Sequence, residues 1–424
     1  MLASSAMNNL FVTYYLDYFI NVVQMDASSF FLGQTIFMIW NAFNDPVFGY
    51  LSDQFSNESN EVIRRSAIIK YGGVFWSLAF VVVFLPVSSS NYLFQFTLAL
   101  CFYDGMLTLV EVNHSALLAD ISVNPGERAT LNAYAAVGAG VGSLSSIAGH
   151  VFWNKEDLFM FRYLVFIVAS LCGICFYVAA EGLRSYSYCR SNTSDCDKEQ
   201  KVVPISTFWR QLLKHRNLWL FQLLYFFQVF DCSFGKNHFG IFLDRFAGSY
   251  FSPSFLGIVI STSFLLPWIV TILMTPSIRK QGLYSVVNIV LLVRVGLCVS
   301  FMPVTHPAIV TLFILANRVV SESICRVCPL IISDLVDEDK YLNKRSGSVS
   351  ASLVGFSTLL GKMSQSLAPM LGFTMLQKNN ELISYVMIFS PLTCVVIQLF
   401  IWSLFTLKGP YLKLVKQIRP KSLV

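Results

Sequence analysis

Long apolar stretches, separated by short polar segments, run through the whole chain. Twelve of these stretches are about 20 residues long, which is the length that an α-helix needs to cross a hydrocarbon core of roughly 30 Å. Their apolar residues do not alternate with polar ones, so they predict helices and not the strands of a membrane barrel. The predicted spans are 2–23, 29–50, 67–87, 92–120, 129–152, 160–182, 216–243, 251–275, 283–303, 307–335, 347–372 and 382–406.

The composition agrees with this pattern. Of the 424 residues, 55% are hydrophobic and only 13% are charged, whereas soluble domains carry about 25% charged residues. The chain is therefore predicted to be an all-α membrane protein. No cleavable signal peptide is visible, because the first apolar stretch is too long and no basic segment precedes it. That stretch begins almost at Met1, which leaves two alternatives open: the first helix is complete, or part of it is missing.

One long polar segment divides the chain into two sets of six spans. A weak internal echo supports duplication, since in each half an apolar run ends at an aspartate, Asp120 or Asp334, followed by an acidic turn and a basic residue. Two six-helix bundles around a central cavity form the architecture of secondary transporters. The predicted domains are an N-terminal bundle (1–182), a cytoplasmic loop (183–215), a C-terminal bundle (216–406) and a basic cytoplasmic tail (407–424).

The basic residues predict the orientation in the membrane. Of the 30 lysines and arginines, 21 fall in segments on the side of the N-terminus and four in segments on the other side. By the positive-inside rule both termini are cytoplasmic. The net charge of +6 lies mostly in these segments, so it requires no nucleic-acid partner. The basic tail is a topology signal in one interpretation and contacts anionic lipid of the bilayer in the other. The absence of a retrieval signal favours the plasma membrane.

The sequence does not support a catalytic or metal-binding motif. The stretches "CGIC" (172–175) and "CRVC" (325–328) have the spacing of redox or zinc motifs, but both lie inside predicted spans. Cysteine in that setting behaves as a small apolar residue. No nucleophile elbow or phosphate-binding loop is present. We therefore expect a protein that is not an enzyme and has no cofactor or metal.

The stretch "IWNAFNDPVFGYLSD" (39–53) places polar residues in the middle of the second span. Asn41 and Asp45 are four residues apart, so their side chains share one helix face. Pro46 removes a backbone donor and is expected to bend the helix there. This face predicts a site for a cation or proton, with a purely structural aspartate as the alternative. Lys362, alone in the eleventh span, must extend to the membrane surface, lose its proton or find a carboxylate, and Asp45 from the other half is the favoured partner.

Further ionisable side chains inside the spans are candidates for the lining of a substrate cavity. One interpretation is that each carboxylate is neutralised by a cation on its own helix; the other is a charged wall in each bundle whose pairing changes during transport. A lone histidine is more often a structural hydrogen-bonding group than a proton relay. The candidates are Asp104, Glu111 and His114 in the fourth span, Asp231 and Lys236 in the seventh, and Arg318, Glu322 and Arg326 in the tenth.

A second kind of site is expected where the second span ends. Asp53 lies at the inner membrane surface, and Arg64 and Arg65 precede the third span. A carboxylate there can pair with these arginines and close the cytoplasmic side in one state. The alternative is an ordinary solvated helix end.

These residues also carry a resemblance. "WNAFNDPVFGYLSD" resembles the second-helix signature of the glycoside–pentoside–hexuronide:cation symporters, the melibiose-permease-like branch of the major facilitator superfamily. "LCFYDGMLTLVEVNHSALLAD", "FWNKED" and "NRVVSESICRVCPLIISDLVDED" resemble animal members of that superfamily. The likeness runs along nearly the whole chain and implies the twelve-helix major facilitator superfamily fold.

The resemblance also implies roles for particular residues. The symporters carry two carboxylates, four residues apart, that bind the coupling cation; Asp45 matches the second, whereas Asn41 stands at the first and lacks its charge. Lys362 matches a lysine beside the cation site. Asp120 matches a fourth-helix carboxylate that helps to hold sugar, which adds it to the cavity candidates. The first-helix sugar carboxylate falls near Ser5, so the sugar site differs from that of the family.

Two hypotheses about function follow. The first is a secondary active transporter, expected to be a monomer, that moves a small polar solute by alternating access. Its solute is sugar-like by resemblance, and coupling to a proton or cation at Asp45, weak coupling or none are open. The second is a membrane scaffold or binder that retains the fold without transport. A midplane cavity lined by the buried charges favours the first.

Overall fold

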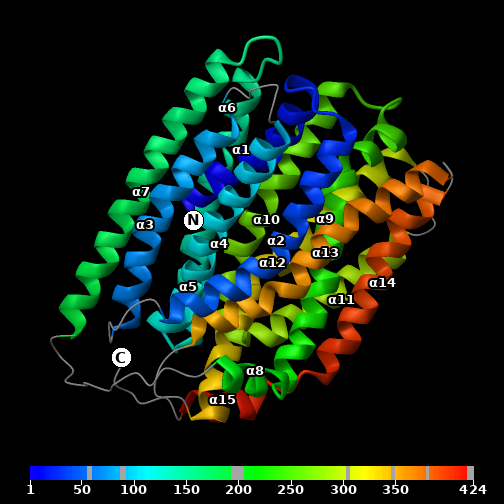
Figure 1. Cartoon of the computed structure of the whole chain (residues 1–424). Coiled ribbons are helices and arrows are strands. Elements are labelled where there is room, and N and C mark those ends of the chain that lie inside the picture. The colour runs from blue at the N-terminus through cyan, green and yellow to red at the C-terminus, as the bar shows by residue number, and fades with distance from the viewer. Residues whose placement is uncertain are drawn as a thin grey trace.

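The computed structural model describes residues 1–54, 60–85, 92–191, 205–301, 306–344, 349–378 and 382–417. Residues 192–204 of the predicted central loop and the end of the predicted tail (418–424) lie outside these residues. In the described ranges every regular element is a helix, and the long helices run side by side (Figure 1).

The N-terminal bundle begins near the middle of the molecule (Figure 1). Its first predicted span is an α-helix that continues as one turn of π-helix, Tyr18–Val22, and its fifth is broken into two helices at Leu144. The helices of this bundle are α1 (Leu2–Asp17), α2 (Ala27–Gln54), α3 (Glu61–Val83), α4 (Tyr92–Ile121), α5 (Pro125–Ser143), α6 (Ser145–Phe152) and α7 (Phe159–Ser191).

The C-terminal bundle contains six long helices, and two short helices lie at one end of the molecule. The helices of this bundle are α9 (Arg216–Ala247), α10 (Pro253–Gln281), α11 (Leu283–Phe301), α12 (Pro307–Asn343), α13 (Ser350–Lys378) and α14 (Leu382–Leu404). The short ones are α8 (Ile205–Leu213) and α15 (Gly409–Gln417). Each predicted span thus corresponds to one long helix or to a broken pair.

Several helix starts follow directly from the sequence. Asn60 caps α3 by accepting from the N–H groups of Val62 and Ile63 at 3.0 and 3.3 Å. Asn124 caps α5 in the same way, and Pro125 occupies the first helical position, where its missing N–H costs nothing. The bend expected at Pro46 does not interrupt α2, which is helical from Ala27 to Gln54.

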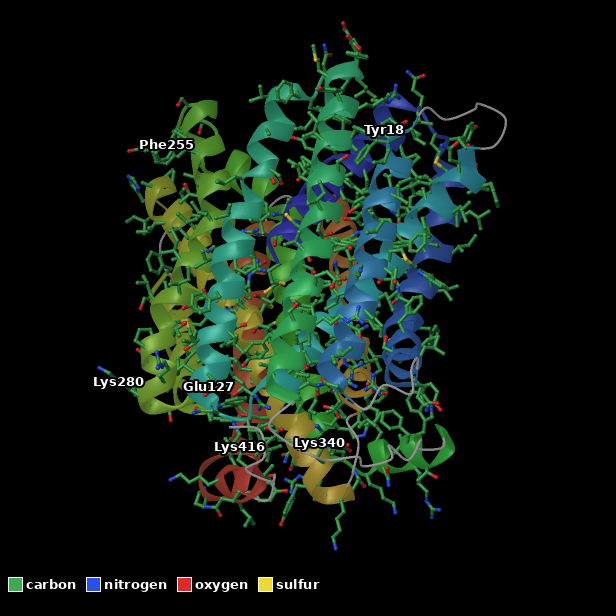
Figure 2. The ribbon with its side chains drawn as sticks, turned by 90° about the vertical axis from the view of Figure 1, so that its left-hand side faces the viewer. Tyr18, Glu127, Phe255, Lys280, Lys340 and Lys416 are labelled. Atoms are coloured by element: carbon green, nitrogen blue, oxygen red, sulfur yellow. The ribbon has the colours of Figure 1, made fainter. Side chains whose placement is uncertain are left out.

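The two ends of the molecule differ in charge. Figure 2 shows Tyr18 and Phe255 toward one end and Lys280, Lys340 and Lys416 toward the other. We call the latter, where α8 and α15 also lie, the basic end. Between the ends, the exposed side chains of α7 include large apolar ones such as Phe166 and Ile174, as expected for a surface that faces lipid.

Apolarity alone does not find all of the long helices. Among the described residues, six helices are individually long and apolar enough to cross a membrane: α3, α4, α7, α9, α11 and α12. Helices α2 and α13 do not meet that test, and they carry Asp45 and Lys362. These two helices pack against each other along the interface between the bundles, as α5 and α10 do on another side.

The contact between α2 and α13 is a backbone contact at two levels. A Cβ atom on Gly355 of α13 would lie 2.2 Å from the carbonyl oxygen of Asp45, and one on Gly49 of α2 would lie 2.3 Å from the carbonyl oxygen of Ala351. Any larger residue would push the helices apart. The two glycines therefore let the bundles approach closely beside Asp45.

Candidate functional site

The central feature of the interface is an ammonium group of one bundle held by carboxylates of the other. Lys362 Nζ lies 2.7 Å from Asp45 Oδ1 and 3.9 Å from Asp104 Oδ1. It also donates hydrogen bonds to Asn44 Oδ1 and Thr108 Oγ1, both at 3.2 Å. The predicted pairing of Asp45 with Lys362 across the bundles is therefore present.

The surroundings of this cluster make it nearly dry. The side chains of Asp45 and Lys362 are 6% and 17% exposed. Thr358 of α13 donates to the second oxygen of Asp45 at 2.6 Å, and Asn44 donates to Asp104. Two carboxylates thus share one ammonium, which leaves one formal negative charge when both are ionised. A cation or proton would neutralise that charge.

Asn41, the residue at the first family position, lies one turn before Asp45. It is buried, and its Oδ1 has no hydrogen-bond partner among the described residues. An amide oxygen can accept a hydrogen bond or bind a cation, but it adds no charge to the site. The roles predicted for Asn41, Asp45 and Lys362 in coupling stay predictions.

A cavity of about 300 Å³ lies between the bundles. Pockets for small molecules typically measure roughly 300–1,000 Å³. Five of the predicted residues line it: Glu111, Lys236, Arg318, Glu322 and Arg326. The rest of the lining comprises Met1, Ser4, Ser5, Asn8, Asn9 and Ser143 from the N-terminal bundle, and Ser263, Phe264, Pro267 and Trp268 from the C-terminal bundle.

Of the two interpretations of these charges, neutralisation within one helix is observed for Glu322 of α12 and not for Asp104 of α4. Arg326 Nη2 lies 3.4 Å from Glu322 Oε2, one turn apart. Asp104 instead takes its cation, Lys362, from α13. Asp104 and His114 are not among the residues that line the 300 Å³ cavity.

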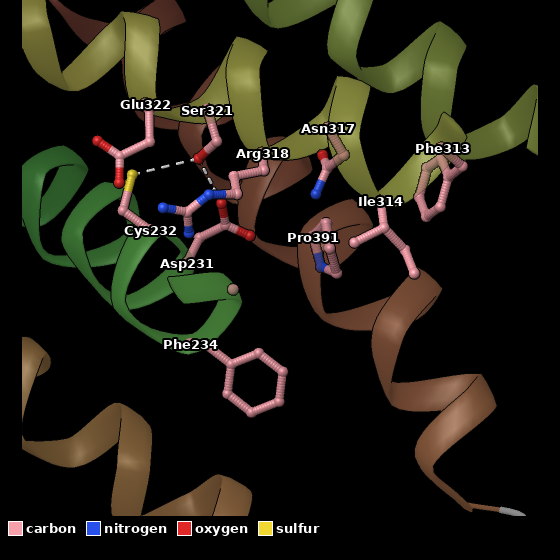
Figure 3. A pocket seen from close by; sticks show the side chains of 11 residues that line it. Asp231, Cys232, Phe234, Phe313, Ile314, Asn317, Arg318, Ser321, Glu322 and Pro391 are labelled. Carbon is pink, nitrogen blue, oxygen red and sulfur yellow. Dashed lines mark hydrogen bonds between the residues drawn. The ribbon is translucent and has the colours of Figure 1, made fainter. Parts of the chain in front are cut away.

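Two further cavity predictions need correction. Asp120 lies nine residues beyond Glu111 on α4, roughly 13 Å along the helix axis, and joins a network at the basic end instead. Asp231 lines a smaller pocket of about 40 Å³ inside the C-terminal bundle, next to Arg318 and Glu322 (Figure 3). It is not among the residues that line the main cavity, and it pairs with Arg294 of α11.

Sequence analysis missed Arg294. This arginine is fully buried, and it donates from Nε to Asn317 Oδ1 at 3.1 Å besides pairing with Asp231. Ser321 completes the site by donating to Asp231 at 2.5 Å, the contact drawn in Figure 3. A lone arginine within the apolar run "VLLVRVGLCV" was the available signal.

The predicted gate residues meet at the basic end. Asp53 of α2 lies 2.5 Å from Arg65 and 3.9 Å from Arg64, as the sequence suggested. Asp53 also accepts from Ser352 N at 2.7 Å, from Ser352 Oγ at 2.5 Å and from Ala351 N at 3.4 Å, all in the first turn of α13. A carboxylate in this position caps the positive end of the helix dipole. We call these bonds from Asp53 to α13 the α2–α13 latch.

Neighbouring groups extend the α2–α13 latch. Ser350 of α13 donates to Asp120 at 2.8 Å, and Arg65 Nη2 donates to Ser350 Oγ at 2.9 Å. Arg65 also lies 3.3 Å from Asp120 and donates to Asn113 at 3.2 Å. Its guanidinium group therefore remains bonded even without Asp53.

A second cross-bundle contact at the basic end was not predicted. Arg128, at the start of α5, lies 3.0 Å from Asp334 and 2.7 Å from Asp337 of α12. Lys416 of α15 lies 2.7 Å from the same Asp334 oxygen. The internal echo was the signal, because Asp120 and Asp334 each end the apolar run of a span in one bundle and contact the first turn of a helix in the other.

Together, the helix arrangement, the polar cavity between the bundles and the cross-bundle charges define a multi-pass membrane protein with the fold of a transporter. The model of the MFS/sugar transport protein family matches residues 1–408. The chain belongs to this family, in which MFS stands for major facilitator superfamily.

Relatives and solved structures agree with this assignment. Transmembrane protein 180 of Mus musculus is 32% identical over 484 aligned residues, covering 99% of this chain and 93% of that protein. The Gallus gallus protein of the same name is 30% identical over 473 aligned residues, covering 98% and 92%. Both relatives are animal proteins and match nearly the whole chain, as the quoted motifs predicted.

The similar solved structures are more distant in sequence and establish the fold. A bacterial homologue of the iron transporter ferroportin, in an outward-facing state, has a TM-score of 0.71 at 14% identity, covering 96% of this chain and 97% of the other. The fucose:proton symporter of E. coli has a TM-score of 0.64 at 14% identity and 96% coverage of both chains. A proton:xylose symporter has a TM-score of 0.65 at 13% identity, with 99% and 96% covered.

Proposed function

We propose that this protein is a secondary active transporter that moves a small, sugar-like polar solute by alternating access. The observation that carries the proposal is Lys362 of one bundle held by Asp45 and Asp104 of the other, in the same interface as a polar cavity of about 300 Å³. Two of the similar solved structures are proton symporters of fucose and xylose, which supports a sugar-like solute and a coupled proton.

The buried charges supply the physical reason for coupling. When Asp45 and Asp104 are both ionised, Lys362 is attracted strongly across the interface. Binding of a proton or cation at Asp45 weakens this attraction and changes the relative free energies of the states in which the bundles, 1–182 and 216–406, tilt against each other. Asn41 replaces one of the two family carboxylates by an uncharged amide, and a proton at Asp45 is the coupling ion that we propose.

The conformation described by the structure has its basic end closed. The Asp53 bonds to α13 and the Arg128 bonds to α12 both join the bundles there. We propose that this end faces the cytoplasm, with the protein in the plasma membrane, and that both contacts break when the cavity opens to that side. A closed basic end agrees with the outward-facing state of the ferroportin homologue.

The test is uptake into proteoliposomes that contain the purified full chain, with radiolabelled monosaccharides and an imposed pH gradient. The wild-type protein should accumulate its solute, and Asp45→Asn should abolish accumulation while retaining exchange of solute at equal concentrations. Asp157→Asn, an exposed aspartate next to α7, is the matched control and should accumulate normally.

Two outcomes would count against the proposal. Unchanged accumulation by Asp45→Asn would remove Asp45 from coupling. A wild-type protein that binds a solute but moves none would favour the alternative function, a scaffold or binder that retains the transporter fold. The replacement of a family carboxylate by Asn41 is the observation behind that alternative.

A further inference from the structure

Two cysteines of the C-terminal bundle lie in direct contact. The Sγ atoms of Cys232, in α9, and Cys325, in α12, are 3.1 Å apart, although the residues are 93 positions apart in the chain. The stretch "CRVC" (325–328) has redox spacing, but Cys328 donates to the carbonyl group of Ile324 in its own helix at 3.3 Å. The contact of Cys325 with another helix therefore has no signal in that spacing.

Polar neighbours fix the position of the Cys232 thiol. Gln228 Nε2 donates to its Sγ at 3.3 Å, and Ser321 Oγ lies 3.3 Å from the same atom. Ser321 also donates to Asp231 at 2.5 Å, and Gln228 also donates to the carbonyl group of Ser321 at 2.8 Å. Loss of the thiol proton of Cys232 therefore leaves both neighbours with other hydrogen bonds.

A small molecule has room beside Cys232. This residue lines the pocket of about 40 Å³ inside the C-terminal bundle, where Figure 3 shows it next to Ser321 and Glu322. One water molecule needs roughly 10–15 Å³ of such space, so a molecule with two oxygen atoms fits. Cys325 is not among the residues that line this pocket. An oxidant in the pocket therefore meets Cys232 first, with the second thiol in contact with it.

We propose that Cys232 and Cys325 form a redox switch, in which hydrogen peroxide converts the two thiols into a disulfide bond between α9 and α12. In the first step Cys232 Sγ attacks one oxygen atom of the peroxide and the O–O bond breaks. The leaving hydroxide takes the thiol proton, so the products are a sulfenic acid and water.

The second step forms the disulfide. Cys325 Sγ attacks Cys232 Sγ, the S–O bond breaks, and the hydroxide leaves with the proton of Cys325 as a second water molecule. The two sulfur atoms lose two electrons in total, and the peroxide gains them. The Sγ atoms have to approach each other by only about 1 Å to reach a bond length of about 2.0 Å. A small dithiol reverses the reaction by thiol–disulfide exchange.

The disulfide joins two helices of the cavity wall. Lys236 follows Cys232 by one turn of α9, Arg326 follows Cys325 on α12, and both Lys236 and Arg326 line the cavity of about 300 Å³. The bond fixes the separation of α9 and α12 at this level, whereas alternating access changes the positions of lining residues. We therefore expect oxidation to slow transport. This consequence rests on the proposed transport function, whereas formation of the disulfide does not.

The experiment detects the bond itself. The purified full chain is treated with hydrogen peroxide, the remaining peroxide is removed with catalase, free thiols are alkylated, and the peptides are mapped by mass spectrometry. The linked peptide pair of Cys232 and Cys325 should be absent before treatment, predominant after it, and absent again after dithiothreitol. The melting temperature of the oxidised protein should rise, because the bond closes a long loop.

Variants separate the roles of the two thiols. Cys325→Ser removes the second thiol, so the sulfenic acid of Cys232 should persist and react with dimedone. Cys232→Ser should leave Cys325 reduced, since Cys325 does not line the pocket. Cys175→Ser, at an exposed cysteine of α7, is the matched control and should form the full amount of the disulfide. Unchanged melting temperatures before treatment would show that the variants fold.

Uptake into proteoliposomes tests the consequence for transport. Peroxide should lower the initial rate of solute uptake several-fold in the wild type and in Cys175→Ser, and dithiothreitol should restore it. Uptake by Cys232→Ser should be insensitive to peroxide, because this variant lacks the thiol that reacts first.

The outcomes distinguish the switch from the transport function. No linked pair after peroxide, a bond from Cys232 to a different cysteine, or a sulfenic acid on Cys325 in Cys232→Ser would overturn the proposed reaction. A disulfide that forms without changing the rate of uptake would overturn the switch. If the disulfide forms but the reduced wild type moves no solute, the redox reaction stands and the transport function fails.

Discussion

The α2–α13 latch gives the most quantitative prediction. Changing Asp53 to Asn keeps the shape and one neutral oxygen acceptor but removes the negative charge. Arg65 keeps Asp120 and Asn113 as partners. Arg64, which lies 3.9 Å from Asp53, loses only this long ion pair. The expected effect is therefore limited to the bonds between Asp53 and the first turn of α13.

The magnitude follows from the bonds themselves. The two short bonds, from Ser352 N at 2.7 Å and Ser352 Oγ at 2.5 Å, each lose about 1 kcal/mol when the acceptor becomes neutral. Loss of a carboxylate at the helix N-terminus adds about 0.3–2 kcal/mol. Together this destabilises the closed basic end by about 2–4 kcal/mol, or roughly 30- to 700-fold in the equilibrium.

The assay is hydrogen exchange measured by mass spectrometry on the full chain in detergent micelles or nanodiscs. The amide of Ser352 donates directly to Asp53, so exchange in the first turn of α13 should accelerate by a similar factor. Asp157→Asn is the control: Asp157 accepts from Phe159 N at 2.9 Å near the start of α7, and its loss should affect that turn alone. Exchange at Ser350–Leu353 within about twofold of wild type in Asp53→Asn would refute the reasoning.

Two further predictions concern the packing of the bundles. Gly355→Val should lower the free energy of unfolding by about 1–3 kcal/mol, because the new side chain would collide with the backbone of Asp45. Gly296→Ala, at a position where nothing lies within 4 Å of the added Cβ, should change it little. Thermal unfolding in detergent tests this, and equal melting temperatures of Gly355→Val and wild type would contradict the close contact. Arg294→Gln should destabilise by about 3–5 kcal/mol by leaving Asp231 buried and uncompensated. The double variant with Asp231→Asn should recover much of that loss, and a strictly additive loss would argue against the pair.

The apolar pattern of the sequence predicts where the long helices lie, but it does not predict where each helix ends. Each predicted span coincides with a helix or a broken pair, because about 20 apolar residues can satisfy their backbone in lipid only as a helix. Helix α12 runs on to Asn343, beyond the predicted end at 335. Its last turns contain Asp337 and Glu338, which are buried against partners from elsewhere, and local hydrophobicity cannot show this.

The residues of the candidate site likewise fall into those that the sequence predicts correctly and those that it does not. Asp45 and Lys362 are charged residues inside apolar spans, so the sequence shows that their burial is costly. Both residues, and the contact between them, were predicted. Asp231 was assigned to the cavity because it is acidic and lies inside a span, and Asp120 because of the family resemblance. The position of each is decided by a partner on another helix, Arg294 or Ser350. Only the packing of helices distant in sequence determines which side a buried carboxylate faces.

Helices α2 and α13 connect the central charge cluster to the latch. The two helices are antiparallel, so the segment from Asp45 to Asp53 of α2 lies beside the segment from Lys362 to Ser352 of α13. Each segment is roughly 12–15 Å long. Between these two levels the backbones touch at Gly49 and Gly355, which leaves little space for the helices to bend separately. A change in the attraction between Asp45 and Lys362 must therefore alter the angle between the whole helices. The bonds of Asp53 lie at the basic end, where a change in this angle produces the largest displacement.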